Sequence, residues 1–270
     1  MRSVPAAVGG LMLAALACNS FGGDAPGTGD AGALSVTDAA GASDGGAIDA
    51  EGAPEASAEA GEQSWPGDPP SIGVACDARA PRPRMCHDFN GSVDVGTSKN
   101  GTLALEPATG DRHLAIKMKD NVTGDVAFYQ DLSGLSRRVR WSFDLLVDSP
   151  LTNETELMEV LNEKKLCSVQ FRRVNNRLVL ADYCTSDAGV LELPLPSTKE
   201  WVSVLAAVDF SAKSFQVAMR TASGVVTRAG PAKLTQLMLG ELSLGIGITY
   251  APKAAPGPKL NLDNVTADWE

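Results

Sequence analysis

Short runs of alternating apolar and polar residues fill the chain after Cys76. Between residues 137 and 147, large apolar side chains stand at every second position: Val139, Trp141, Phe143, Leu145 and Val147. A period of two with one apolar face is typical of a strand that is half-buried in an antiparallel sheet. The alternation and the turn residues between the runs predict fourteen short strands, at residues 84–90, 101–106, 113–119, 125–131, 137–147, 154–161, 166–174, 177–184, 189–193, 200–209, 213–220, 224–228, 241–249 and 259–268.

Helical periodicity is almost missing from the same region. Only residues 231–239 could form a helix, of one or two turns. Many short strands without a long helix are typical of a β-sandwich or a β-barrel. We therefore expect an all-β domain at residues 71–270, either a sandwich or a barrel of antiparallel strands.

The first eighteen residues have the features of an export signal. Arg2 is positively charged, residues 8–17 are apolar, and small residues precede Cys18. This segment resembles the lipobox of bacterial lipoproteins, in which the cysteine is lipidated and becomes the mature N-terminus. The resemblance implies a signal peptide at residues 1–18, lipid attachment at Cys18 and, because Asn19 follows, an exported protein anchored to the outer membrane on its periplasmic or outer side. The alternative is ordinary signal cleavage beside an incidental cysteine.

Residues 19–70 differ in composition from the rest of the chain. Ten of the 33 acidic residues lie here, and no Lys or Arg does. The segment is rich in Gly and Ala and has too few large apolar residues to offset the entropy lost on ordering. We expect a disordered acidic linker that holds the domain away from a membrane. Binding of calcium or of a basic partner by these acids is the alternative.

The remaining residues are nearly neutral. After residue 70 the chain has 23 acidic residues against 22 Lys and Arg, so it lacks the basic surface of a nucleic-acid-binding protein. No apolar run reaches the 18 residues that a membrane-spanning helix needs, and we expect membrane contact through the lipid anchor only. With only two His residues in the chain, a metal site or a catalytic triad built on His is not expected.

Two of the five cysteines bracket a predicted hairpin. Asn175 and Asn176 lie midway between Cys167 and Cys184, and Asn tolerates the positive φ of a two-residue type I′ turn. With this turn, the numbers of facing residues sum to 351, so the two cysteines face each other. They form a pair without ladder hydrogen bonds, where the Cα atoms come closest. This spacing predicts a Cys167–Cys184 disulfide, with two free thiols as the alternative.

This pairing leaves three cysteines to be assigned. Cys76 and Cys86 are ten residues apart beside the first predicted strand, and we expect them to form a second disulfide. Cys18 is then the odd cysteine, which agrees with lipidation.

Four segments resemble the concanavalin A-like lectin/glucanase jelly rolls, which include laminin G-like domains, on bacterial lipoproteins. They are Cys86-His87-Asp88-Phe89-Asn90-Gly91, Arg140-Trp141-Ser142-Phe143-Asp144-Leu145, Lys199-Glu200-Trp201-Val202-Ser203-Val204 and Leu262-Asp263-Asn264-Val265-Thr266-Ala267-Asp268. The resemblance covers most of residues 71–270. It implies a jelly-roll β-sandwich of two packed antiparallel sheets, one of them concave, with the first and last strands as neighbours.

An acidic segment is the candidate for catalysis. Family-16 glycoside hydrolases share this fold class and carry Glu-x-Asp-x-Glu, or a bulged Glu-x-Asp-x-x-Glu, on a concave strand. Glu154-Thr155-Glu156-Leu157-Met158-Glu159 is similar to the bulged form. The resemblance implies Glu154 as nucleophile and Glu159 as acid/base of a retaining hydrolase. The alternative is a bulged or helical surface element with solvated acids.

Asp88 and Asp263 are the candidates for a metal site. They lie on segments that become neighbours if the first and last strands pair, and carboxylate oxygens are ligands that Ca²⁺ prefers. A structural calcium, as in several jelly-roll families, is one interpretation. The other is that both acids are solvated or accept backbone hydrogen bonds, in which case the domain needs no cofactor.

Three function classes remain open at this point. We expect a monomeric, non-catalytic binding module for a polysaccharide, a surface glycan or another extracellular ligand. Trp201, Tyr129 and Tyr183 are the aromatic candidates for the ligand platform. The glycoside hydrolase using Glu154 and Glu159 is the first alternative. A structural envelope lipoprotein without a ligand is the second.

Overall fold

Fourteen antiparallel strands and one short 3-10 helix, η1 (Cys76–Ala78), are present in the described part of the chain. The computed structural model describes residues 66–270, except 80–81, 91–94, 96–97, 108–109, 133–136, 163–166, 184–188 and 236–240. Each strand overlaps a segment in which alternation predicts one. The strands are β1 (Met85–His87), β2 (Gly101–Glu106), β3 (His113–Met118), β4 (Gly124–Leu132), β5 (Arg138–Val147), β6 (Glu156–Asn162), β7 (Cys167–Val174), β8 (Arg177–Asp182), β9 (Val190–Pro194), β10 (Trp201–Asp209), β11 (Ser214–Thr221), β12 (Val226–Lys233), β13 (Leu242–Ala251) and β14 (Lys259–Trp269).

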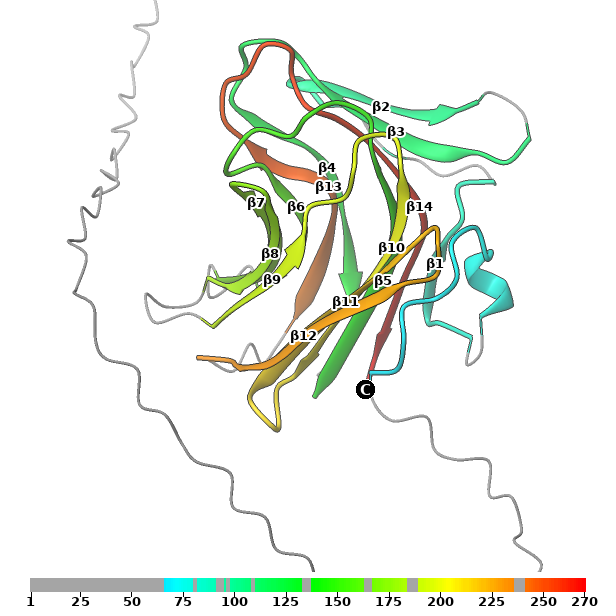
Figure 1. The fold of residues 1–270 in the computed structure, drawn as a ribbon, viewed down its shortest axis with the longest axis vertical. Coiled ribbons are helices and arrows are strands. Elements are labelled where there is room, and N and C mark those ends of the chain that lie inside the picture. Colours follow the sequence, from blue (N-terminus) through cyan, green and yellow to red (C-terminus); the bar gives the residue numbers. More distant parts are fainter. Residues whose placement is uncertain are drawn as a thin grey trace, which may run out of the picture. The chain divides into compact units, whose positions relative to one another are not determined.

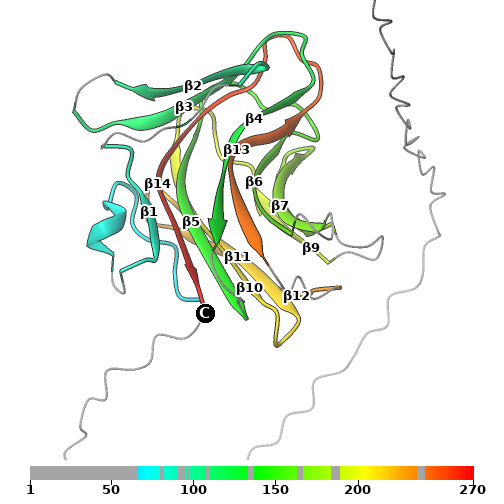
Figure 2. The same ribbon diagram turned by 180° about the vertical axis from the view of Figure 1, so that it is seen from behind.

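The strands form two sheets that pack face to face (Figures 1 and 2). Sheet A has the order β12-β11-β10-β5-β14-β3-β2, and β1 adds to β14. Sheet B has the order β4-β13-β6-β7-β8-β9, and its strands curve visibly at β7 and β8 (Figure 1). The fold is therefore a two-sheet antiparallel jelly-roll β-sandwich. As expected, the first and last strands are neighbours, since His87 of β1 faces Val265 of β14.

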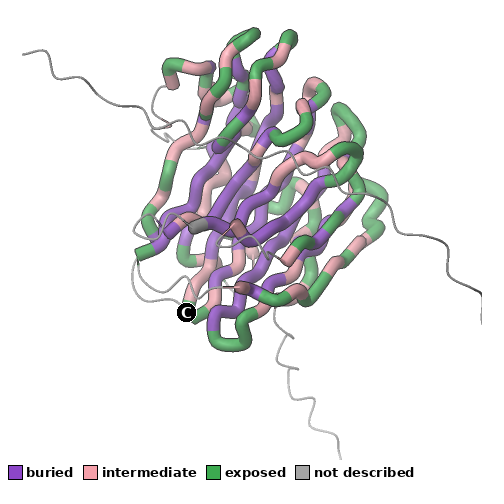
Figure 3. The backbone as a smooth tube through the Cα atoms, turned by 90° about the vertical axis from the view of Figure 1, so that its left-hand side faces the viewer, coloured by how far each residue is buried: buried purple, intermediate pink, exposed green. Residues whose placement is uncertain are grey.

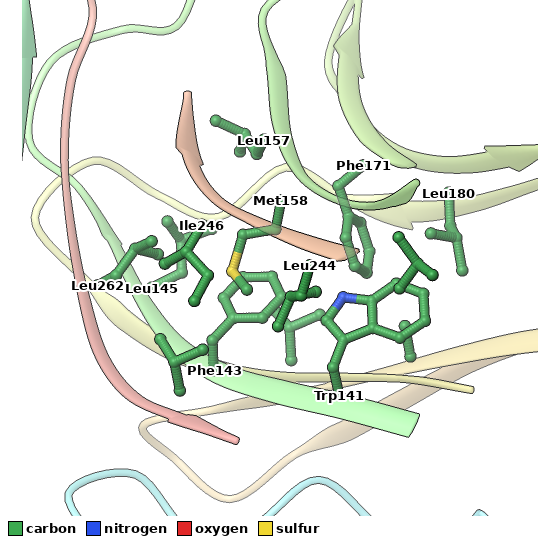
Figure 4. Packing of buried hydrophobic residues seen from close by; sticks show 14 of the residues in the cluster. Trp141, Phe143, Leu145, Leu157, Met158, Phe171, Leu180, Leu244, Ile246 and Leu262 are labelled. Atoms are coloured by element: carbon green, nitrogen blue, oxygen red, sulfur yellow. The ribbon is translucent and has the colours of Figure 1, made fainter. Parts of the chain in front are cut away.

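The core between the sheets is built from the apolar faces of the strands. Trp141 and Phe143 of β5 point from sheet A toward Phe171 of β7 in sheet B, with ring centroids 6.3 and 5.5 Å apart (Figure 4). Such edge-to-face pairs stabilise by about 0.5–1.5 kcal/mol beyond the burial of their area. Strand centres are buried and the connecting turns are exposed (Figure 3). Alternation along each strand thus places one set of side chains inside and the other set outside.

The predicted hairpin register is confirmed. Val174 faces Arg177, and Val169 faces Asp182, so facing numbers sum to 351. Asn175 has a φ of 52°, but Asn176 has no positive φ, so the two-residue turn is present and is not of the expected type I′. Cys184 and the side chain of Cys167 lie outside the described residues. The Cys167–Cys184 disulfide therefore stays a prediction, which peptide mapping under non-reducing conditions can test.

The helix expected at residues 231–239 is wrong for the part that the structure describes, residues 231–235. Pro231 to Lys233 continue β12, where Lys233 faces Ser214 of β11. β12 is the edge strand of sheet A, and a proline is tolerated there because no further strand needs its missing N–H. Residues 236–240 lie outside the described part. In the part of the chain that the structure describes, no helix is long and apolar enough to cross a bilayer.

A segment that precedes the first strand packs on the outer face of sheet A. We call residues 66–79 the strap. Cys76 of η1 forms a disulfide with Cys86 of β1, with the two Cα atoms 5.6 Å apart. The signal peptide, Cys18 and the linker up to residue 65 lie outside the described residues. Residues 66–70, which composition assigns to the linker, are part of the strap.

Candidate functional site

The outer face of sheet B carries a line of polar side chains. Tyr129 of β4 faces Gly245 of β13, Gly245 faces Glu159 of β6, and Glu159 faces Gln170 of β7. The residues that precede or follow them on each strand, such as Leu244 and Val160, belong to the core. Since alternate residues point to opposite sides of a sheet, the line points away from the core. Glu159 and Gln170 are nevertheless buried, because their neighbours on this face cover them.

A β-bulge brings a second carboxyl group to this face. The pairing of β6 with β7 shifts between Leu157 and Glu159, and Met158, the extra residue, has a φ of 27°. Leu157 and Met158 are both in the core. Glu156 and Glu159 therefore both point outward although they are three residues apart. This is the bulged arrangement that the acidic pattern suggests.

Burial shifts the proton equilibria of this pair. The pKa of Glu156 is raised to about 7, mainly by burial and then by the negative charge of Glu159, against the opposing charge of Arg172. Burial also raises the pKa of Glu159, while hydrogen bonds with Ser168 and Tyr129 act in the other direction. The Tyr129 hydroxyl donates to Glu159 Oε1 at 3.3 Å. Near neutral pH, Glu156 is thus divided between a proton-donating and a proton-accepting form.

Two of the three predicted aromatic residues lie on this face. The ring of Tyr129 rests over Gly245, where an added Cβ would come within 2.9 Å of Tyr129 Cε1, and Tyr129 is 45% exposed. Tyr183 follows β8, and the guanidinium carbon of Arg172 is 4.9 Å from the centre of its ring. Four strand spacings separate β4 from β8, which amounts to about 19 Å. The carboxyl pair lies on a strand between the two tyrosines.

Two other predicted residues are placed elsewhere. Trp201 begins β10 of sheet A, where its ring contacts the His113 ring edge-on at 5.8 Å. Glu154 precedes β6, is exposed, and donates its N–H to the Arg173 carbonyl at 2.8 Å. The carboxyl pair on the outer face is therefore the half-buried Glu156 and the buried Glu159. Glu156 occupies the middle acidic position of the family-16 pattern, and its place in that pattern could have identified it from the sequence.

The candidate calcium ligands lie at the β1–β14 pairing. The pKa of Asp263 is raised to about 7, mainly by burial and also by the charges of Asp144, Asp111 and Asp88, against the opposing hydrogen bond from the Asn264 N–H. Asp88 Oδ1 accepts the Asn90 N–H at 3.1 Å, as the backbone-bonded interpretation expects. Among the described residues, no three His, Cys, Asp or Glu side chains are grouped closely enough to hold a metal ion. A structural calcium at Asp88 and Asp263 stays a prediction.

The sequence matches no protein-family model and no curated protein. The solved structures that are similar include the cellulose-induced protein Cip1, with 9% identity, a TM-score of 0.48, and coverage of 68% of this chain and 96% of that one. The carbohydrate-binding module CBM66 from Bacillus subtilis has 11% identity, a TM-score of 0.39, and coverage of 63% and 92%. The catalytic domain of a glycoside hydrolase family 131 protein from Coprinopsis cinerea has 14% identity, a TM-score of 0.43, and coverage of 62% and 77%. At such identities the likeness is one of fold.

Proposed function

We propose that the outer face of sheet B binds a carbohydrate. The observation that carries this proposal is the half-exposed Tyr129 ring, which lies against the sheet and is hydrogen-bonded to the buried Glu159. An aromatic ring beside fixed polar groups suits a sugar, which presents both apolar C–H faces and hydroxyl groups. Gly245 leaves room for that ring, because any side chain there would collide with it.

The polar groups of the face supply both kinds of hydrogen-bonding partner. Glu156 and Glu159 accept when ionised, Gln170 donates and accepts, and Arg172 donates from a planar guanidinium. Tyr183 offers a second ring on the far side of these groups, which favours an extended ligand over a single sugar unit. The predicted lipid anchor and linker would present such a module to a polysaccharide or a surface glycan beyond the membrane.

Hydrolysis of a glycosidic bond is a second candidate, and one observation favours it. Glu156 and Glu159 lie on one face of a bulged strand, and both pKa values are raised. Glycosidases need one carboxyl group that is protonated near neutral pH and a second that is ionised. In this proposal Glu156 is the general acid and Glu159 the nucleophile or base. Glu154→Gln and Glu156→Gln in the same cleavage test decide between this pair and the pair suggested by sequence, Glu154 and Glu159.

The test compares binding with cleavage on one panel of polysaccharides. We expect Tyr129→Ala to weaken binding at least fivefold, as truncation of a central aromatic contact does. Glu106→Gln, an exposed carboxylate change on β2 of sheet A, is the matched control and should bind like the wild type. The hydrolase is favoured if the wild type releases reducing ends and Glu159→Gln abolishes this release while it still binds the polysaccharide. If the wild type binds and cleaves nothing on a broad panel, the carbohydrate proposal fails.

A further inference from the structure

The strap contacts sheet A at several points and leaves cavities between itself and the sheet. Arg220 of β11 donates from Nε to the Pro69 carbonyl at 2.9 Å, and the Gly73 N–H donates to Asp144 of β5 at 3.0 Å. Between these anchor points a cavity of about 400 Å³, partly open to solvent, lies between the strap and sheet A. A second cavity of about 260 Å³ lies between residues 66–68 and strands β11 and β12. Asp68 lines both cavities and so stands at their boundary.

Two arginines on adjacent strands hold the Asp68 carboxylate. Ala218 of β11 faces Arg228 of β12, so Arg220, two residues further along β11, is the diagonal neighbour of Arg228 on the same face. Side chains in this relation are within reach of each other, and two cations placed so repel. Asp68 relieves the repulsion: its Oδ1 pairs with Arg228 Nη2, and its Oδ2 is 3.8 Å from Arg220 Nη2. Each carboxylate oxygen thus faces a different guanidinium.

We propose that Arg220 and Arg228 form a binding site for the carboxylate of an acidic sugar, and that Asp68 fills this site as an internal stand-in. The two guanidiniums belong to paired strands, whereas Asp68 belongs to the irregular strap. The Asp68 and Arg228 side chains are 51% and 56% exposed. Exposed ion pairs of this kind are weak, so a ligand carboxylate can replace that of Asp68.

The cavity beside Arg220 indicates the rest of the ligand. Its volume lies within the range of small-molecule sites. Its sheet side includes Arg140 and Asp268, an ion pair at 2.8 Å whose side chains are partly exposed and can meet sugar hydroxyls. Its strap side includes Pro66, Pro69 and Pro70, whose apolar rings suit the C–H face of a pyranose. A uronic acid combines these features. The site lies on the sheet opposite the proposed carbohydrate face and does not rest on that proposal.

The experiment is calorimetric titration of the full chain with sodium glucuronate at constant ionic strength. Glucose and sodium acetate, at the same concentrations, separate the contributions of the sugar and of the carboxylate. We expect glucuronate to bind more tightly than either. Arg228→Gln should weaken glucuronate binding about tenfold or more, because it removes a charged hydrogen-bond donor. Asp68→Asn should tighten it about threefold, because it removes the internal competitor.

The test uses Arg228→Gln rather than a change at Arg220, because Arg220 also anchors the strap through the Pro69 carbonyl. Arg177→Gln, an equally exposed arginine on sheet B, is the matched control and should leave glucuronate binding unchanged. Weaker binding in Asp68→Asn overturns the proposal, as does equal binding of acetate or of glucose. No binding of glucuronate by either the wild type or Asp68→Asn overturns it as well.

Discussion

A buried ion pair under the strap allows a quantitative prediction of stability. Asp144 of β5 is 1% exposed, and the Arg79 side chain, which comes from the strap, is 10% exposed. Arg79 Nη2 lies 4.0 Å from Asp144 Oδ2, and Arg79 Nη1 donates to Ser142 Oγ at 2.7 Å. Arg79→Met keeps much of the apolar stem but removes the charge. The variant leaves Asp144 buried without its cation.

The expected cost is large relative to the stability of a domain. Breaking a buried ion pair from one side destabilises by about 3–5 kcal/mol. Asp144 keeps the hydrogen bonds from the Gly73 N–H and from Asn264 Nδ2, both at 3.0 Å, so we take the lower end, about 3 kcal/mol. With a urea m-value of about 2–3 kcal/mol/M, the unfolding midpoint should fall by about 1–1.5 M.

The loss of unfolding free energy in Arg79→Met should also depend on pH. Burial raises the pKa of Asp144 above its usual value, even with Arg79 nearby, and Arg79→Met raises it further. A carboxyl group with a raised pKa in the folded state favours the protonated form on folding. Its stabilising contribution is present at low pH and is lost as the pH rises through the folded pKa. The destabilisation caused by Arg79→Met is therefore largest at neutral pH and becomes smaller toward acid pH.

The assay is urea unfolding followed by tryptophan fluorescence at pH 7 and at pH 5. Arg177→Met is the matched control, because Arg177 and Glu192 form an exposed pair at 3.9 Å that should contribute no more than about 1 kcal/mol. The additional change Asp144→Asn in the Arg79→Met background should recover part of the loss. The reasoning is refuted if Arg79→Met costs no more than the control, or if its cost is the same at both pH values.

Three further predictions concern the outer face of sheet B and the membrane anchor. Gly245→Ala places a Cβ within 2.9 Å of the Tyr129 ring, so glycan binding should weaken at least fivefold while the free energy of unfolding falls by only about 1–3 kcal/mol. Unchanged glycan binding would contradict the role given to the Tyr129 ring. In an NMR titration Glu156 should show a midpoint near 7 that falls in Glu159→Gln, and a midpoint near 4.5 in the wild type would count against the interaction of the two carboxyl groups. Cys18→Ala should leave the membrane fraction, and a variant that stays there has another anchor.

Alternation and turn chemistry were enough to predict most of the fold. A half-buried strand repeats every two residues, so the strands of the sandwich could be placed from the positions of their apolar side chains. The β7–β8 register followed from a single feature, the Asn175-Asn176 turn, because a two-residue turn leaves only one way to pair the flanking strands. In both cases the determinant is local in sequence.

The strap could not be predicted in the same way. Residues 66–70 are rich in proline and have no apolar period, which is also the composition of a linker. They are held by partners far along the chain: Pro69 is 151 residues from Arg220, and Asp68 is 160 residues from Arg228. Contacts of this kind depend on the order of strands in sheet A. No local signal in the sequence records that order.

The carboxyl pair depends on one inserted residue. In a regular strand, Glu156 and Glu159 would point to opposite sides, because three steps change the face. One of them would then enter the apolar core as an unpaired charge, at a cost that would displace the strand. The bulge at Met158 removes this conflict by placing Leu157 and Met158 both inside and the two glutamates both outside. A pattern of acids could suggest the bulge, but only the pairing with β7 and β13 decides which two acids meet. The same pairing places Tyr129 beside Glu159, whose carboxylate accepts a hydrogen bond from the Tyr129 hydroxyl.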